Sequence, residues 1–182
     1  MSKRTLLTMQ VFDASRVAKL QGDVIELGVA AGSTTFPLAR LMAEQCPEKV
    51  LYACDTFEGL PYTESAALKK GSINWGNRFI SQYEIAQQTN ICMVKGMCES
   101  TLPERLENHK FCFAWLDMDL ENSTRFAFKF LEDRIVIGGV VGFHDYKFHL
   151  CPGIEKVVAE IDRTKWKQLV HESTCIYFER IR

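Results

Sequence analysis

Two short groups of acidic and imidazole side chains could carry chemistry in this sequence. Asp117 and Asp119 directly follow one apolar run, and His144 and Asp145 directly follow another. If the two runs are neighbouring parallel strands, all four side chains face one crevice, where carboxylates suit Mg²⁺ and an added imidazole favours Mn²⁺, Fe²⁺ or Zn²⁺. A metal held there would lower the pKa of a substrate hydroxyl, and a carboxylate outside its ligand set could take the proton. The alternative is a solvated acidic rim, or an aspartate that caps a helix at Ser123.

A loop with two glycines could hold a ligand nearer the N-terminus. Gly28 and Gly32 would let the chain turn tightly and approach a ligand closely, but Ala30 stands where a G-x-G-x-x-G loop has its middle glycine. Glu26, just before the loop, would suit a ligand with an ammonium group. Asp55 ends the next apolar run, roughly 20 residues beyond the loop, where an acid can accept both hydroxyls of a ribose. The alternative is an ordinary tight turn with Asp55 capping a loop.

Alternating apolar runs and helical patterns must position these residues. Short apolar runs ending in small or polar residues are typical of strands buried in a parallel sheet. The alternation predicts a three-layer α/β/α domain with right-handed crossovers and ligands beyond the carboxyl ends of its strands. The expected strands are 24–29, 50–55, 91–94, 111–116 and 140–143. A C-terminal antiparallel hairpin over 166–181 is expected to complete a mostly parallel seven-stranded sheet. The expected helices are 3–20, 33–45, 76–89, 123–134 and one that begins at Pro152.

The composition is typical of one globular domain. The chain has 182 residues, 47% hydrophobic and 25% charged, which predicts a single domain over 1–182 with a sizeable core. Lys and Arg number 22 against 23 Asp and Glu, so the net charge of −1 gives no broad attraction to nucleic acid or an anionic membrane. The apolar runs fall far short of the roughly 20 residues that span a bilayer. We expect neither nucleic acid nor a membrane as a partner.

The cysteines favour a reducing compartment. There are seven, and no pair has C-x-x-C spacing, which argues against a zinc knuckle or a thioredoxin-type site. Cys54, Cys92 and Cys112 lie within apolar runs, where they are most simply small buried hydrophobes. The first residues lack the apolar segment and cleavage site of a signal peptide. We therefore expect a cytoplasmic protein with free thiols.

Several longer stretches together match the pattern of a known family. They are Gly-Asp-Val-Ile-Glu-Leu-Gly-Val-Ala-Ala-Gly-Ser at 22–33, Leu-Tyr-Ala-Cys-Asp-Thr-Phe-Glu-Gly-Leu-Pro at 51–61, and shorter matches at 94–96, 101–103, 116–120, 123–124, 138–139 and 144–146. With them the chain resembles the macrocin O-methyltransferase family. The most specific part is Asp-Thr-Phe-Glu-Gly-Leu-Pro at 55–61. The resemblance implies a Rossmann-like class I methyltransferase fold and metal-dependent methyl transfer from S-adenosylmethionine to a hydroxyl of a sugar or another small molecule.

The same resemblance implies a role for each matching residue. Asp119 would be the general base on the acceptor hydroxyl. Asp117 and Asp145 would hold a divalent metal, Mg²⁺ or Mn²⁺, with His144 as the third predicted ligand where the family normally has an aspartate. The cofactor-binding residues would be Glu26, Gly28, Ala30, Gly32, Ser33, Asp55, Thr56, Phe57, Gly96, Met97 and Asp117, with the methionine end at Glu26, the ribose at Asp55 and the adenine near Gly96.

Further expectations concern the loop, the assembly and competing functions. We expect 57–75 to act as a lid that excludes water, and the family suggests a homodimer. One alternative function is a regulatory module that binds S-adenosylmethionine without catalysis, its metal site altered by His144. Another is a nicotinamide-dependent oxidoreductase, which Ala30 and Glu26 disfavour.

Overall fold

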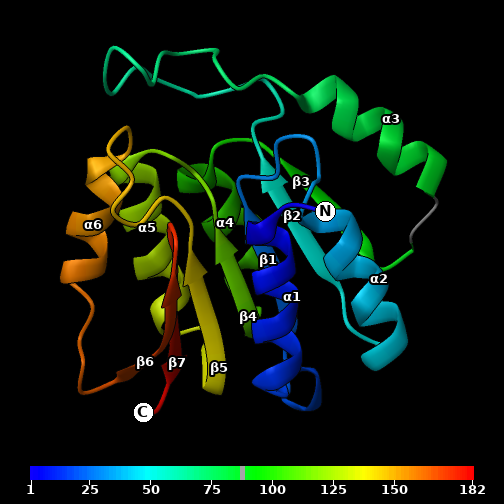
Figure 1. Ribbon diagram of the computed structural model, residues 1–182. Coiled ribbons are helices and arrows are strands. Elements are labelled where there is room, and N and C mark those ends of the chain that lie inside the picture. The colour runs from blue at the N-terminus through cyan, green and yellow to red at the C-terminus, as the bar shows by residue number, and fades with distance from the viewer. Residues whose placement is uncertain (87–88) are drawn as a thin grey trace.

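Seven strands form one sheet in the computed structural model, which describes residues 1–86 and 89–182. They are β1 (Asp23–Leu27), β2 (Leu51–Asp55), β3 (Ile91–Lys95), β4 (Phe111–Leu116), β5 (Ile135–Phe143), β6 (Trp166–Glu172) and β7 (Cys175–Arg180). Their order is β3-β2-β1-β4-β5-β7-β6, with β1 to β5 parallel and β7 antiparallel to both β5 and β6 (Figure 1). The predicted mostly parallel sheet with a C-terminal antiparallel hairpin is confirmed.

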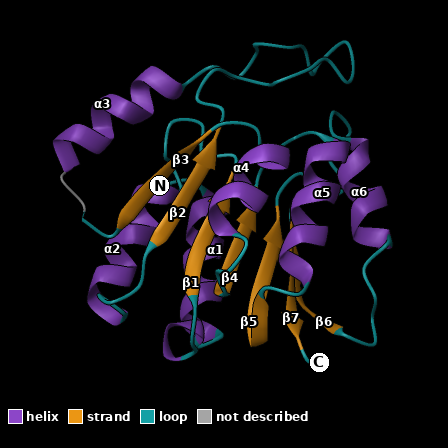
Figure 2. Cartoon of the chain, turned by 180° about the vertical axis from the view of Figure 1, so that it is seen from behind, coloured by secondary structure: helices purple, strands orange, loops and turns teal. Residues whose placement is uncertain are grey.

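Helices cover both faces of the sheet (Figure 2). They are α1 (Lys3–Ala14), the short 3₁₀ helix η1 (Val17–Lys19), α2 (Thr35–Gln45), α3 (Gly76–Ala86), α4 (Cys98–Leu106), α5 (Glu121–Glu132) and α6 (Pro152–Ala159). The side chains of α1 and α2 pack on one face, and those of α4, α5 and α6 pack on the other. None of the described helices combines the length and apolar character needed to cross a membrane.

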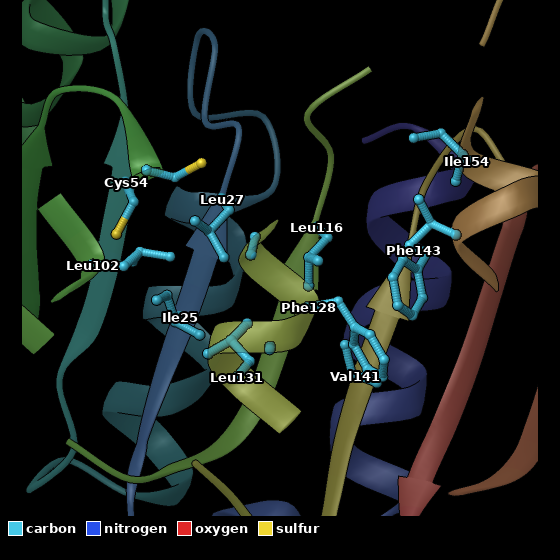
Figure 3. Packing of buried hydrophobic residues seen from close by; sticks show 14 of the residues in the cluster. Ile25, Leu27, Cys54, Leu102, Leu116, Phe128, Leu131, Val141, Phe143 and Ile154 are labelled. Atoms are coloured by element: carbon cyan, nitrogen blue, oxygen red, sulfur yellow. The ribbon is translucent and has the colours of Figure 1, made fainter. Parts of the chain in front are cut away.

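Burial on both faces explains the apolar runs of the strands. Successive residues of β1 point to opposite faces: Val24 packs in the core beside α1 and α2, and Ile25 packs in the core beside α4 to α6. Figure 3 shows Ile25, Leu116 and Phe143 within the second core, where Phe128 of α5 reaches the sheet. Because both faces are dry, a strand needs apolar residues at every position rather than at alternate ones.

The N-terminal helix is shorter than expected. It ends at Ala14, and Arg16 adopts a left-handed conformation with φ 55° that a helix cannot continue through. The 3₁₀ turn of η1 then buries Val17 against the face of the sheet that α1 and α2 cover. The apolar spacing over 3–20 is therefore divided between two elements that share one buried face.

Helix α4 was absent from the expected elements. Pro103 lies inside it, and proline ordinarily interrupts a helix interior. The helix forms because Leu102 and Leu106 are buried against α5 and the sheet, which outweighs the local cost. The helix expected over 76–89 begins at its predicted residue, and its expected end at 87–88 lies outside the described residues.

The fifth strand and one cysteine also differ from expectation. β5 begins at Ile135 and runs through the glycine pair, whereas a strand was expected only after it. Gly138 has φ 83° and lies where the register between β4 and β5 shifts, between the pairs Phe111–Ile135 and Phe113–Val140. Cys92 is exposed because β3 is the edge strand of the sheet, so its side chain has solvent rather than a further strand beside it.

Candidate functional site

The predicted chemical residues meet in one pocket at the carboxyl ends of the five parallel strands, β1 to β5. The loop between β2 and α3 arches over this end of the sheet (Figure 1). The predicted residues that line the pocket are Glu26, Gly28, Ala30, Ser33, Asp55, Thr56, Gly96, Met97, Asp117, Asp119, His144 and Asp145. The sheet order reverses between β1 and β4, the position where open α/β sheets bind ligands.

Two predicted residues, Gly32 and Phe57, lie outside the lining of that pocket. Phe57 is buried and stacks on Phe79, with ring centroids 5.0 Å apart. A Cβ on Gly32 would lie 2.3 Å from the ring of Phe36, so the glycine lets this ring pack against the loop. In the structure both residues pack the loops against α2 and α3.

Asp55 ties the glycine loop to the end of β2. Its Oδ2 accepts hydrogen bonds from the backbone N–H groups of Val29 (2.7 Å) and Ala30 (2.9 Å), and its Oδ1 accepts from the N–H of Phe57 (2.8 Å). The hydroxyl of Thr56 lies 3.3 Å from Oδ1 but only 2.6 Å from the carbonyl oxygen of Gly59, which is the better acceptor for its single proton. A carboxylate offers about four acceptor sites, and three are occupied by N–H groups, so the two hydroxyls of a ribose would have to share or exchange some of these bonds. The predicted ribose contact of Asp55 stays a prediction.

Glu26 is a buried acid without a full set of partners. The residue belongs to the lining of the pocket although it is only 1% exposed. Burial raises the pKa of Glu26 to about 8, and the charge of Asp117 adds to this while Thr35 and Arg4 oppose it. Its Oε2 has no hydrogen-bond partner among the described residues. An ammonium group would satisfy this oxygen and favour the ionised carboxylate.

An imidazole joins two of the carboxylates. His144 Nδ1 lies 2.8 Å from Asp117 Oδ1 and 3.1 Å from Asp145 Oδ1. Burial lowers the pKa of His144, but the two carboxylates outweigh it and raise the pKa to about 9. The two adjacent carboxylates thus favour the protonated imidazole in the ligand-free protein, and Nδ1 must be free of its proton to bind a metal.

Asp119 sits beside this group in the conformation of a strained turn. Burial, followed by the charges of Asp117 and Asp145, raises the pKa of Asp119. Asp119 and Asp145 have φ angles of 62° and 57°, and Ala30 has 49°. Such left-handed residues cost about 1–3 kcal/mol each and gather at functional sites. The raised pKa makes the Asp119 carboxylate a better proton acceptor than an ordinary aspartate, and both the raised pKa and the strained backbone are typical of functional sites.

The donor set fits a divalent metal. One ligand atom from each of Asp117, His144 and Asp145 lies within 4.8 Å of the others, as do those of Asp119, Asp145 and Cys151. Two carboxylates and an imidazole are the ligands that Mn²⁺ and similar ions accept, and carboxylates alone suit Mg²⁺. The predicted metal role remains a prediction, with a ligand set that the geometry permits.

Several pocket residues escaped the sequence reasoning. Arg4 reaches the pocket from α1, with Nη1 2.8 Å from Asp117 Oδ2. On the other side Ser123 Oγ donates to Glu99 Oε1 (3.0 Å) and lies 3.2 Å from the hydroxyl of Tyr62. Each residue is brought in by the packing of a helix or loop onto the strand ends, which a local pattern does not reveal. Ser123 lies within the family stretch 123–124, and that match was its signal in the sequence.

A family model matches nearly the whole chain. The model of the Macrocin-O-methyltransferase (TylF) family matches residues 3–172. The comparison with curated proteins gave no match.

Solved structures share the fold at low sequence identity. The O-methyltransferase NovP is 21% identical with a TM-score of 0.83, covering 99% of this chain and 80% of its own. CalS11, a TDP-rhamnose 3'-O-methyltransferase of calicheamicin biosynthesis, is 18% identical with a TM-score of 0.72, covering 98% and 81%. SMU.1697c from Streptococcus mutans, solved in complex with SAH, is 15% identical with a TM-score of 0.69 and covers all of both chains. At these identities the structures establish the Rossmann-like class I fold.

Proposed function

The chain belongs to the macrocin O-methyltransferase family, and we propose that its strand-end pocket is where a methyl group passes from S-adenosylmethionine to a small-molecule hydroxyl. The observation that carries the assignment is the meeting of the family stretches, from five strand ends, in one pocket. Membership makes the chain an S-adenosylmethionine-dependent O-methyltransferase. It thereby favours catalysis over a binding module and over nicotinamide chemistry.

The cofactor would lie across the ends of β1 and β2. When bound, S-adenosylmethionine supplies an electrophilic methyl group on a positively charged sulfur. Glu26 would pair with its ammonium group, because the buried carboxylate has an unpartnered oxygen. Gly28 lets the glycine loop pack closely on the backbone that follows β4, since a Cβ there would lie 1.9 Å from the carbonyl oxygen of Asp117. Asp55 would hold the ribose, and Gly96 with Met97 would border the adenine.

The metal would be held by Asp117, His144 and Asp145. A divalent ion there would lower the pKa of the acceptor hydroxyl. The residue pair His144–Asp145 replaces two aspartates with one imidazole and one carboxylate, which we expect to shift preference from Mg²⁺ toward Mn²⁺. The support is the closeness of the three ligand atoms.

Asp119 would act as the general base. Its burial among acids raises its pKa, so the carboxylate is a stronger proton acceptor than an exposed aspartate. Asp119 would take the hydroxyl proton while the hydroxyl oxygen bonds to the methyl carbon and the carbon–sulfur bond breaks, the sulfur keeping the electron pair. The products are the methyl ether, S-adenosylhomocysteine and a proton on Asp119.

The loop 57–75 would serve as the lid. Tyr62 contacts Ser123 at the start of α5, and Glu64 Oε2 accepts a 2.9 Å hydrogen bond from the N–H of Glu121. Leu60 and Pro61 line the pocket beneath. These contacts would hold the loop over the reacting groups and limit water, as closing loops do in other transferases.

We propose a sugar hydroxyl as the acceptor. CalS11, which shares the fold, is a TDP-rhamnose 3'-O-methyltransferase. Nucleic acid is disfavoured as an acceptor because the net charge of −1 gives the chain no broad attraction to phosphate.

Calorimetry with S-adenosylhomocysteine tests the assignment, run with and without Mg²⁺ and Mn²⁺. We expect binding that one of the ions strengthens, loss of that ion effect in Asp117→Asn, and wild-type behaviour in Asp133→Asn, which removes an exposed carboxylate at the far end of α5. Binding without an ion effect would overturn the metal role alone. Binding of NAD in place of S-adenosylhomocysteine would overturn the pocket assignment. Methyl transfer to a panel of nucleotide-linked and free sugars would then identify the acceptor.

A further inference from the structure

Arg4 brings a fixed positive charge into a pocket dominated by acids. Among the residues that line it, Arg4 and His144 are the basic ones within the described chain. His144 lies between Asp117 and Asp145 and contacts both carboxylates, so its charge is already engaged. Arg4 has Nη1 2.8 Å from Asp117 Oδ2 and Nη2 3.0 Å from Ser33 Oγ. A guanidinium has five N–H groups, so donors remain for a ligand.

The position of Arg4 is held by the helix that carries it. Thr5, the next residue, donates from Oγ1 to the carbonyl of Ser33 at 3.2 Å. One turn later Thr8 Oγ1 lies 2.9 Å from the hydroxyl of Tyr177 on β7, and both groups are buried. These contacts fix α1 against the glycine loop and the sheet. The guanidinium is thereby directed to the end of the pocket where β1 and β4 stop.

The same end of the pocket holds Glu26, the proposed partner of the cofactor's ammonium group. The methionine part of the cofactor also carries a carboxylate, one bond from the carbon that bears the ammonium. Asp117, Asp119 and Asp145 would repel that carboxylate unless a cation received it. Arg4 is the cation with unengaged donors at this end, and the planar guanidinium matches a carboxylate in shape.

We propose that Arg4 receives the carboxylate of the cofactor's methionine part, with Asp117 and Ser33 orienting the guanidinium. This inference rests on the proposed function. It assigns helix α1 a direct role in cofactor binding. The positive Arg4 would bind the carboxylate, whereas the negative Glu26 would bind the ammonium group. The ammonium and carboxylate groups of the methionine part would then face Glu26 and Arg4, respectively. Glu26 is buried and Arg4 is half-buried, and both lie near the glycine loop.

Two ligands that differ by one group test the proposal. S-adenosylhomocysteine carries the carboxylate, whereas its decarboxylated analogue keeps the adenosine, the sulfur and the ammonium group. Calorimetry would measure both ligands with wild type and with Arg4→Gln. We expect Arg4→Gln to weaken S-adenosylhomocysteine binding about 10- to 100-fold and to change binding of the analogue less than about 2-fold. Arg4→Lys, which keeps the charge but not the planar fork, should fall between wild type and Arg4→Gln.

Lys3→Gln is the matched control, because it removes an exposed positive charge one residue away on the same helix. It should leave both affinities unchanged. Equal losses for both ligands in Arg4→Gln would mean that Arg4 only holds the loop through Ser33, and would overturn the proposal, as would no loss for either. Retained binding of the analogue also proves that the variant is folded. If wild type binds neither ligand, the proposed function itself fails, a result distinct from the other outcomes.

Discussion

Replacing Glu26 with glutamine should stabilise the ligand-free protein while weakening its cofactor binding. Burial raises the pKa of Glu26 from 4.5 to about 8. The folded state therefore binds more protons than the unfolded state between these values, and stability falls as pH rises through them. Below pH 4.5 the carboxyl is protonated in both states and costs nothing. Above pH 8 it is ionised in both, and the full cost of the buried charge is present.

The size of the effect follows from the two pKa values. One pKa unit corresponds to about 1.4 kcal/mol, so Glu26 should cost about 3 kcal/mol at pH 7 and approach about 5 kcal/mol above pH 8. Glu26 is 1% exposed, so solvent screening reduces this little. The neutral amide of glutamine avoids the cost at every pH. The advantage of Glu26→Gln over wild type should therefore grow by about 3 kcal/mol between pH 4 and pH 7.

Urea unfolding followed by circular dichroism at pH 4, 5.5, 7 and 8 measures this difference. Comparing pH values cancels any fixed effect of the substitution on packing. Glu104→Gln is the matched control, because it removes the same negative charge from a solvent-exposed position on α4. A difference between Glu26→Gln and wild type that stays constant within about 0.5 kcal/mol from pH 4 to pH 8 would refute the reasoning. It would mean that the carboxyl reaches solvent or a cation in the ligand-free protein.

Three further predictions follow from the site and the core. Asp119→Asn should keep S-adenosylhomocysteine affinity and lower turnover on the identified sugar at least about 100-fold, measured by calorimetry and steady-state kinetics. Tyr177→Phe removes the buried hydrogen bond to Thr8 and should lower the free energy of unfolding by about 1–2 kcal/mol in urea titrations. Gly28→Ala would place a Cβ 1.9 Å from the carbonyl oxygen of Asp117, just after β4, and should abolish cofactor binding. Gly71→Ala is the comparison, because a Cβ there meets open space and only the φ of 78° is unfavourable. It should lower the free energy of unfolding by about 1–2 kcal/mol in thermal melts and leave cofactor binding intact.

The parallel strands could be predicted from the sequence because burial on both faces demands apolar residues at every position. β4 matches the expected 111–116 to the residue for this reason. Where local chemistry and packing disagree, the prediction failed. Pro103 and the glycine pair at 138–139 are locally unfavourable to helix and strand, yet the buried neighbours of each hold α4 and β5 together. Such outcomes depend on tertiary contacts that no short window of sequence contains.

The candidate site was predictable to the extent that the sheet builds it. Asp55, Asp117 and His144 end parallel strands, and parallel strands bring their carboxyl ends to one edge, so their convergence follows from the strand pattern. Arg4 could not be found this way. Its place depends on how α1 docks, which is decided by contacts such as Thr8 with Tyr177, separated by 169 residues. The left-handed backbone of Asp119 is likewise a property of the folded turn.

The distribution of charge in the pocket connects its energetics to its function. Six carboxyl groups line it, from Glu26, Asp55, Glu99, Asp117, Asp119 and Asp145, against the two basic groups of Arg4 and His144. The raised pKa values of Glu26 and Asp119 reflect the free-energy cost of ionising carboxyl groups that are buried close to other acids. A cationic sulfonium with its ammonium group, and a divalent ion, would each reduce that cost. Binding of these ligands would therefore stabilise the protein, and relief of the charge repulsion in the ligand-free state would contribute to the binding free energy.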